Sequence, residues 1–159
     1  MTMASPFRRN VLVSIRPAYA SKILEGLKTV ELRRKFPKET TIGATAVIYS
    51  SSPVCAIVGY ARIKDVHKLR VSEIWKQYAG AACIARKDFD AYFSGLEYGF
   101  AIFLDRIKSL VQHLKADELE NEFGLFPPQS FRYLTEEPGS LLHDERLQTS
   151  HRYKHRHRA

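Results

Sequence analysis

Apolar positions near the start of the chain first alternate and then recur with a helical period. Residues 11–16 alternate apolar side chains with others, which predicts a strand with one apolar face. Pro17 then suits the first turn of a helix. Gly26 is its expected C′ residue, because glycine readily adopts the left-handed conformation that ends many helices. The inner stripe of this helix consists of Tyr19, Ala20, Ile23 and Leu24.

The strand that follows this turn has a charged face. Thr29, Glu31 and Arg33 alternate with apolar residues that face inward, and Lys28 lies in the turn itself. Charges of both signs are costly to bury on a short strand of a small domain. We therefore predict that this face lines a polar cleft, which either binds phosphates or exocyclic amides or carries out acid–base chemistry. The alternative is an ion-pair ladder on a solvated strand, which contributes little stability.

The remaining pattern is rich in strands. Gly59 within one long apolar segment predicts a bulge or bend, as barrel closure often needs. Runs of adjacent strands favour an α+β fold with a small closed or half-closed barrel and helices at its rim, and disfavour a doubly wound parallel sheet. The predicted elements are strands at about 44–50, 55–66, 97–107 and 107–113, and helices at 72–80, 86–93 and from Pro127 to about Leu134. The helix at 86–93 places Phe89, Tyr92 and Phe93 inward.

Length and charge refine this picture. A chain of 159 residues fits one domain, which we place at 10–136, between a flexible leader (1–9) and a flexible tail (137–159) with few apolar anchors. The formal net charge is +8, and four of these positive charges lie in the last eight residues. The folded part is therefore only mildly basic, which is compatible with nucleic-acid binding but is also explained by solubility.

Other function classes are disfavoured by the sequence. There is no apolar run of the roughly 20 residues that a membrane span needs, and the first residues lack the apolar stretch of a signal peptide. Cys55 and Cys83 are read as reduced thiols, so a cytoplasmic protein is predicted. Metal-site, P-loop and dinucleotide motifs are missing, and we predict no metal or cofactor. The His/Arg-rich end, 151–158, is read as an arm with salt-sensitive affinity for nucleic acid, or as a solvated end.

Several short motifs occur in an order that resembles the ASCH domain (activating signal cointegrator homology) of the PUA-like superfamily. The resemblance covers roughly residues 10–110. It implies a six-stranded barrel with flanking helices, a cleft beside the first helix, and binding of RNA rather than DNA, or of a nucleotide, in RNA processing or transcriptional regulation. The motifs are Ser14-Ile-Arg16-Pro17, Gly26-x-Lys28-Thr29-x-Glu31-x-Arg33, Gly43, Val47-Ile-Tyr49-Ser50-Ser51-x-Pro53 and Ile57-Val58-Gly59.

The resemblance also implies an enzymatic alternative. Some small members are similar to an amidohydrolase of N4-acetylcytidine that uses a lysine, a threonine and a glutamate. Lys28 falls on that lysine, but the threonine falls on Glu31, so this sequence departs from the pattern there. Glu73 is a candidate for the glutamate by location only. Other members are similar to a ribonuclease. If the protein is a hydrolase of a modified nucleoside or of RNA, Lys28 and Glu31 are its predicted catalytic residues.

The candidate binding residues have distinct chemical roles. Glu31 can accept hydrogen bonds from the exocyclic amine of a base, while Lys28 and Arg33 supply positive charge for phosphate. A lysine desolvated beside a carboxylate can also act as a base or nucleophile. The full predicted set is Arg16, Lys28, Thr29, Glu31, Arg33, Tyr49, Ser51 and Ser52.

Some of these assignments have structural alternatives. Arg16 either contacts phosphate or bonds carbonyls at the helix entry. Ser51 and Ser52 either cradle an anion or simply form a turn. Tyr49 either stacks on a base or packs in the core. The segment 127–132 either closes one end of the cleft and places Gln129 or Arg132 near the ligand, or serves structural closure only.

Overall fold

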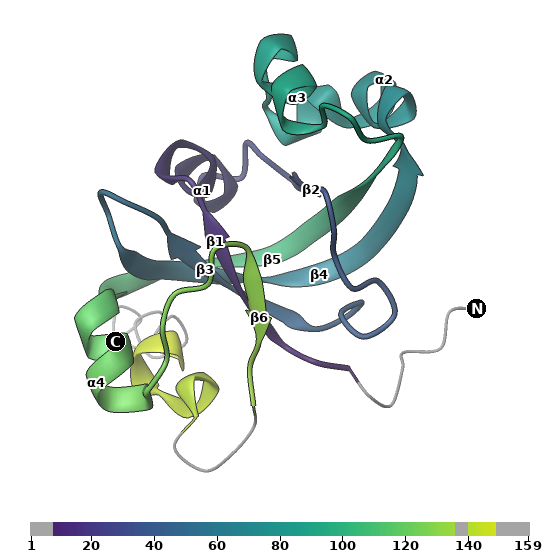
Figure 1. Cartoon of the computed structure of the whole chain (residues 1–159). Helices are drawn as coiled ribbons and strands as arrows, with labels where there is room; N and C mark the ends of the chain where they lie inside the picture. Colours follow the sequence, from purple (N-terminus) through teal and green to yellow (C-terminus); the bar gives the residue numbers. More distant parts are fainter. Residues whose placement is uncertain (1–7, 136–139, 149–159) are drawn as a thin grey trace, which may run out of the picture.

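The computed structural model describes residues 8–135 and 140–148, and in these residues the chain forms a curled six-stranded sheet surrounded by short helices (Figure 1). The elements in chain order are β1 (Val11–Ile15), α1 (Pro17–Leu24), β2 (Val30–Arg33), β3 (Thr45–Ser50), β4 (Ala56–Arg70), α2 (Val71–Ala82), α3 (Arg86–Tyr92), β5 (Tyr98–Lys115), α4 (Ala116–Phe123), β6 (Phe131–Tyr133) and the 3-10 helix η1 (Leu141–His143).

The sheet is mixed and strongly curved. Its strand order is β2-β5-β4-β3-β1-β6, in which β1 pairs with β3 in parallel and the other neighbours are antiparallel. The long strands β4 and β5 form the curve, with α2 and α3 at one end and α4 at the other (Figure 1). The predicted α+β class, a small half-closed barrel of about six strands with short helices, is confirmed.

Two glycines allow sharp changes of direction. Gly26 has a φ of +78° directly after α1, which lets the chain turn into β2. A Cβ atom at Gly59 would lie 2.4 Å from the carbonyl oxygen of Lys108, so only glycine lets β5 come this close. The register of β4 and β5 shifts at this point, between Ile57 and Gly59. The irregularity predicted at Gly59 is therefore present, and it helps the sheet to curl.

The predicted strands and helices differ from the structure in two places. The two strands expected at 97–107 and 107–113 form one strand, β5, which continues through register shifts and through Arg106 at a φ of +48°. The helix expected from Pro127 is absent from the described residues, and β6 pairs antiparallel with β1 instead. Prolines disfavour helical geometry in the residue before them, and Phe131 and Tyr133 alternate with the exposed Arg132 as in an edge strand.

Buried apolar residues form three clusters around the sheet. One fills the concave side and includes Ile23 of α1, which fastens that helix over the sheet. A second lies between the sheet and α4. The third joins β2 and β5 to α2 and α3, with Phe89 at its centre. Because α1, α3 and β2 are each held by core residues, the polar groups between them have fixed positions.

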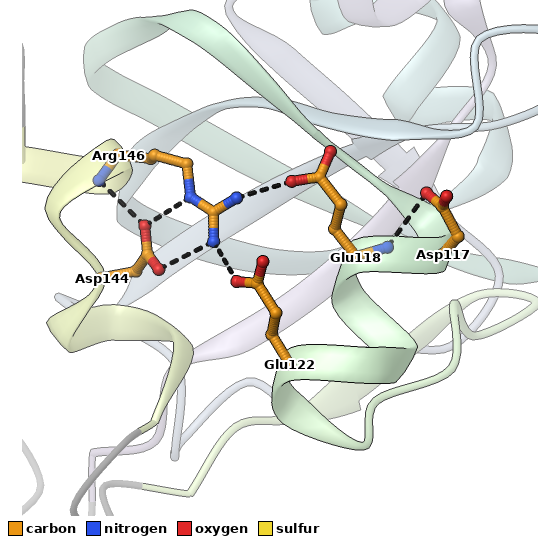
Figure 2. Close-up of polar contacts among 5 residues, drawn as sticks. All are labelled: Asp117, Glu118, Glu122, Asp144 and Arg146. Atoms are coloured by element: carbon orange, nitrogen blue, oxygen red, sulfur yellow. Dashed lines mark hydrogen bonds and ion pairs between the residues drawn. The ribbon is translucent and has the colours of Figure 1, made fainter.

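Part of the predicted flexible tail is packed on the domain. Leu141 and Leu147 are buried in the second cluster. Arg146 donates hydrogen bonds to Asp144 and to two glutamates of α4, Glu118 and Glu122 (Figure 2). The ordered structure thus extends past the expected boundary at 136. Residues 1–7 and 149–159 lie outside the described residues, so the flexible leader and the basic arm remain predictions.

The described residues contain no helix that is both long and apolar enough to cross a membrane. Within residues 8–135 and 140–148, no group of three or more His, Cys, Asp or Glu side chains is placed to hold a metal ion.

Candidate functional site

A cleft of about 1070 Å³ opens between the first helix, the charged strand β2, helix α3 and the segment before β6. Its walls carry both charged and aromatic side chains. The polar and aromatic residues that line it are Ser14, Arg16, Tyr19, Lys28, Glu31, Arg33, Arg34, Lys35, Ser51, Asp88, Tyr92, Ser94, Gln129, Ser130 and Phe131.

Glu31 lies on the floor of the cleft, and one of its carboxylate oxygens accepts no hydrogen bond from the described residues. Only 9% of the residue is exposed. Its Oε1 accepts a hydrogen bond of 2.9 Å from the backbone N–H of Leu32. Its Oε2 is buried and has no hydrogen-bond partner in the described part of the chain; Nη2 of Arg33 lies 3.9 Å away, too far for a hydrogen bond. A buried oxygen without a hydrogen-bond partner is costly in a folded protein, so a ligand group that donates to this atom would be favoured.

Arg33 holds three segments together and also keeps one donor free. Its Nη2 donates to the carbonyl of Ser14, 2.7 Å away, and its Nη1 to the hydroxyl of Ser130, 3.2 Å away. These bonds tie β2 to β1 and to the segment before β6. The Nε–H of Arg33 is buried and lacks a partner among the described residues. An unused donor and an unused acceptor therefore occur on two residues of one cleft lining.

Lys28 is more deeply buried than Glu31 or Arg33, with only 2% of the residue exposed. Its Nζ donates to the carbonyls of Val30 and Ala82, at 2.9 and 2.7 Å, and lies 5.0 Å from the ring centre of Tyr19. Desolvation lowers the pKa of Lys28, and the nearby charge of Glu31 opposes this shift. The Lys28 ammonium thus places positive charge near Glu31, while it donates its hydrogen bonds to backbone carbonyls.

The rim of the cleft is basic and partly aromatic. Arg16, Arg34 and Lys35 are exposed there. The guanidinium of Arg34 lies 5.1 Å from the ring centre of Tyr92, within the range of a cation–π contact. Asp88 is an acidic exception. This combination of exposed cations at the mouth and buried polar groups on the floor suits a ligand with a phosphate outside and a base inside.

The structure divides the predicted residues. The cleft lining contains Arg16, Lys28, Glu31, Arg33 and Ser51, which the sequence had brought together by spacing and resemblance. That lining does not contain Thr29, Ser52, Tyr49 or Glu73.

The excluded residues have other surroundings. Thr29 and Ser52 are exposed. Tyr49 is 5% exposed within the second apolar cluster, and burial raises its pKa to about 12. Of its two alternatives, the core position is the one observed. Glu73 accepts a hydrogen bond from Gln77 on the surface of α2.

Several cleft residues were missed. Arg34 and Lys35 directly follow the charged strand, and their position was the signal that could have identified them. Tyr19 and Tyr92 were read as core residues from helical spacing, but both are half-buried and line the cleft. Gln129 does line it, whereas Arg132, its alternative, lies outside the lining.

Comparison with known proteins places this fold and cleft in a family. The ASCH domain profile matches residues 13–125. The chain therefore belongs to the ASCH domain family.

Two relatives make the likeness concrete. A protein of Zymomonas mobilis named ASCH domain-containing ribonuclease is 32% identical over 138 residues, which is 86% of this chain and 92% of that protein. The crystal structure of ASCH from Zymomonas mobilis superposes with a TM-score of 0.76 and 29% identity, covering 81% of this chain and 90% of that one. The likeness thus includes nearly the whole of each relative.

Proposed function

We propose that this protein binds single-stranded RNA, or a modified nucleotide, in the cleft. The observation that carries the proposal is the pair of buried, unused polar atoms on its floor, Oε2 of Glu31 and Nε of Arg33. One accepts and the other donates, which complements the edge of a nucleobase that offers an exocyclic amine beside a ring nitrogen or carbonyl. The membership in the ASCH family and the ribonuclease name of a relative support a role connected with RNA.

The rim supplies the remaining contacts in this proposal. Arg16, Arg34 and Lys35 contact the phosphate, and Tyr92 offers a ring against which the base or sugar packs. Single strands are favoured over duplexes because a base must leave its stack to reach a floor this deep. Cytoplasmic location and a role in RNA processing or transcriptional regulation are wider expectations that accompany this proposal.

A second candidate function, RNA hydrolysis, is favoured by the name of the relative and by the free oxygen of Glu31. In that reaction Oε2 takes the proton of a ribose 2′-hydroxyl, and the 2′-oxygen attacks the adjacent phosphorus. The bond from phosphorus to the 5′-oxygen breaks, that oxygen receives a proton from water, and Glu31 returns its proton to the solvent. The cations of the cleft stabilise the charge that develops on the phosphoryl oxygens. Lys28 acts electrostatically here, since its Nζ already donates to two carbonyls.

The test combines binding and turnover on purified protein. Anisotropy with a labelled single-stranded RNA is recorded at about 50 and 200 mM salt, and products of the same RNA and of N4-acetylcytidine are followed by chromatography. Binding should weaken steeply with salt, because several phosphates release counterions when they meet the cations of the cleft. The full chain and a chain ending at residue 148 are compared, so that the effect of the predicted basic arm is separated from the cleft.

Lys28→Arg separates the two candidate functions. A binding protein should keep much of its affinity, because the charge is retained. A hydrolase in which Lys28 serves as base or nucleophile should lose turnover completely, because arginine stays protonated. Product formation that survives Lys28→Arg but stops in Glu31→Gln would assign the proton transfer to Glu31. A wild-type protein that neither binds nor cleaves RNA or the nucleoside would refute the proposal.

A further inference from the structure

A second hollow of about 560 Å³ lies beside the cleft. The two cavities share the lining residues Arg34, Lys35, Leu96 and Phe131, so they adjoin each other. The rest of the second lining is mainly aromatic, and its charged residues are Lys68 and Glu97. We call it the aromatic groove, and its distinguishing residues are Phe36, Lys68, Tyr98 and Phe100.

Strand pairing places one residue of the cleft floor and two residues of this groove in a single row across the sheet. Arg33 of β2 is paired with Phe100 of β5, and Phe100 is paired with Lys68 of β4. Side chains of directly paired residues project from the same face of a sheet. Neighbouring strands are about 4.8 Å apart, so this row spans about 10 Å from the cleft to the far wall of the groove. A ligand in the cleft that continues along the row meets Phe100 and then Lys68.

The groove combines exposed rings with cations. Tyr98 is 41% exposed. The Nζ of Lys68 lies 5.5 Å from the Tyr98 ring centre and 6.0 Å from that of Phe100, and the Arg70 guanidinium is also 5.5 Å from Tyr98. The acidic residue present, Glu97, forms an ion pair with Arg70. Accessible rings between cations are typical of surfaces that stack the bases of single strands while holding the backbone.

We propose that the aromatic groove binds the nucleotide next to the one in the cleft. The base of this second nucleotide stacks on Tyr98 and Phe100, and its phosphate contacts Lys68 or the shared residues Arg34 and Lys35. This inference rests on the proposed function, and it adds a minimum ligand: a single strand of two or more nucleotides. The positive charge around the rings is the reason to choose a nucleotide over an apolar peptide as the occupant.

The test compares ligand lengths. Affinity is measured by calorimetry for cytidine monophosphate and for single-stranded RNAs of two, four and six nucleotides. Wild-type affinity should rise about tenfold or more between one nucleotide and two, because a base gains a stacking platform. Tyr98→Ala should lower the affinity for the longer RNAs about tenfold and leave that for the mononucleotide unchanged within about twofold.

Charge is tested in the same series. Lys68→Ala should weaken the longer RNAs at low salt and reduce the slope of log affinity against log salt by about 0.7, the value for one phosphate of a single strand. The matched controls are Phe126→Ala and Lys64→Ala. Phe126 is 60% exposed, Lys64 lies on the same strand as Lys68, and both are outside the two linings. Thermal midpoints verify that each variant is folded.

The outcomes separate this inference from the proposed function. Mononucleotide binding without any gain for longer RNA would overturn the inference and leave the proposed function standing. If Tyr98→Ala binds RNA with wild-type affinity, the inference is also overturned, and a protein partner becomes the occupant to test in the groove. A loss in Tyr98→Ala that is equal for all ligand lengths would show that the groove is no separate subsite. If no nucleotide or RNA binds to the wild type, both proposals fail together.

Discussion

Arg33 and Arg146 both lie beside carboxylates, but their surroundings are satisfied to different degrees. All three guanidinium nitrogens of Arg146 donate to carboxylate oxygens, with Nε 2.8 Å from Asp144 and Nη1 2.7 Å from Glu118 (Figure 2). Arg33 donates to a carbonyl and a hydroxyl, and it lies 3.9 Å from Glu31 without a hydrogen bond to it. Both the Nε of Arg33 and the Oε2 of Glu31 lack hydrogen-bond partners in the described residues.

The difference separates a structural cluster from a binding site. The guanidinium nitrogens of Arg146 already donate to carboxylate oxygens, so a further ligand would form few new hydrogen bonds there. On the cleft floor the fold holds two polar atoms away from water without satisfying them, which costs stability unless something else binds. Unsatisfied groups persist where the surrounding structure fixes them and function requires them. Stability and RNA affinity should therefore respond in opposite ways to changes in the two regions.

The largest effect expected is on stability, in Arg146→Ala. The change leaves Asp144, Glu118 and Glu122 close together without their cation, while the side chain of Arg146 is only 20% exposed. The free energy of unfolding should fall by about 2 kcal/mol, and RNA affinity should stay at the wild-type value. Urea denaturation and anisotropy on the same preparations measure the two quantities.

Arg146→Lys is the matched control. It keeps the charge but cannot donate to three carboxylates in a fixed plane, so about half of the loss should remain. A drop in RNA affinity in either variant, at a temperature where the protein is folded, would break the comparison by linking this cluster to the cleft.

The second effect is expected in Glu31→Gln, which keeps the shape of the side chain and removes its charge. RNA affinity should fall about tenfold, or about 1.4 kcal/mol, because an amide that presents its NH₂ to the ligand no longer accepts from a base. The free energy of unfolding should change by less than about 1 kcal/mol or rise, since Oε2 loses no hydrogen bond. Glu31→Asp, with the charge kept but withdrawn, should be intermediate in affinity.

A destabilisation in Glu31→Gln as large as that of Arg146→Ala would contradict this reading. Glu31 would then be a structural residue like Arg146. Its ion pair with Arg33 would explain why a carboxylate is buried at this position, without a ligand.

The sequence predicted the cleft better than the cluster at Arg146, for physical reasons. Glu31 and Arg33 share one face of a short strand through its period of two, and Lys28 lies in the turn just before it, so local spacing brings the three together without knowledge of the fold. Arg146 reaches α4 across more than twenty residues, and no local pattern relates it to Glu118. For the same reason Leu141 and Leu147 looked like too few apolar anchors, although α4 completes their packing.

The fold was predictable where local signals agreed with tertiary context. Pro17 and Gly26 mark the ends of α1 through their own backbone preferences. Phe131–Tyr133 became a strand only because β1 was available at the edge of the sheet, which no local propensity reports. Tyr19 and Tyr92 had helical spacing that predicts burial, but spacing cannot tell a core from the wall of a cleft.

A third effect is expected on the free energy of unfolding at low pH. Hydrogen bonding to Arg146 lowers the pKa of Asp144 below its ordinary value of 3.8. The unfolded chain then binds a proton more readily than the folded one, so this stabilisation is present above pH 3.8 and is lost as the pH falls through the lowered pKa. Its size should be about 1 kcal/mol, in keeping with a charge-assisted hydrogen bond at a partly buried site.

The measurement is the free energy of unfolding between pH 3 and pH 6 for the wild type and Asp144→Asn. Asp65 and Asp105 also have lowered pKa values, so the difference between the two proteins isolates Asp144. Curves that stay parallel over this range would show that Asp144 and Arg146 are not coupled in solution.

The smallest effects are expected at predicted site residues that the cleft leaves out. Thr29 and Ser52 are exposed and outside its lining, while Arg16 and Ser51, two other predicted site residues, are within it. Thr29→Ala and Ser52→Ala should change stability by less than about 0.5 kcal/mol and RNA affinity by less than about twofold. Arg16→Ala, assayed beside them, should weaken RNA more than either, because it removes a cation from the rim. If Thr29→Ala weakens RNA as much as Arg16→Ala does, the ligand must extend over the turn after α1. Exposure to solvent, rather than unsatisfied groups on the floor, would then be the better guide to where this protein binds.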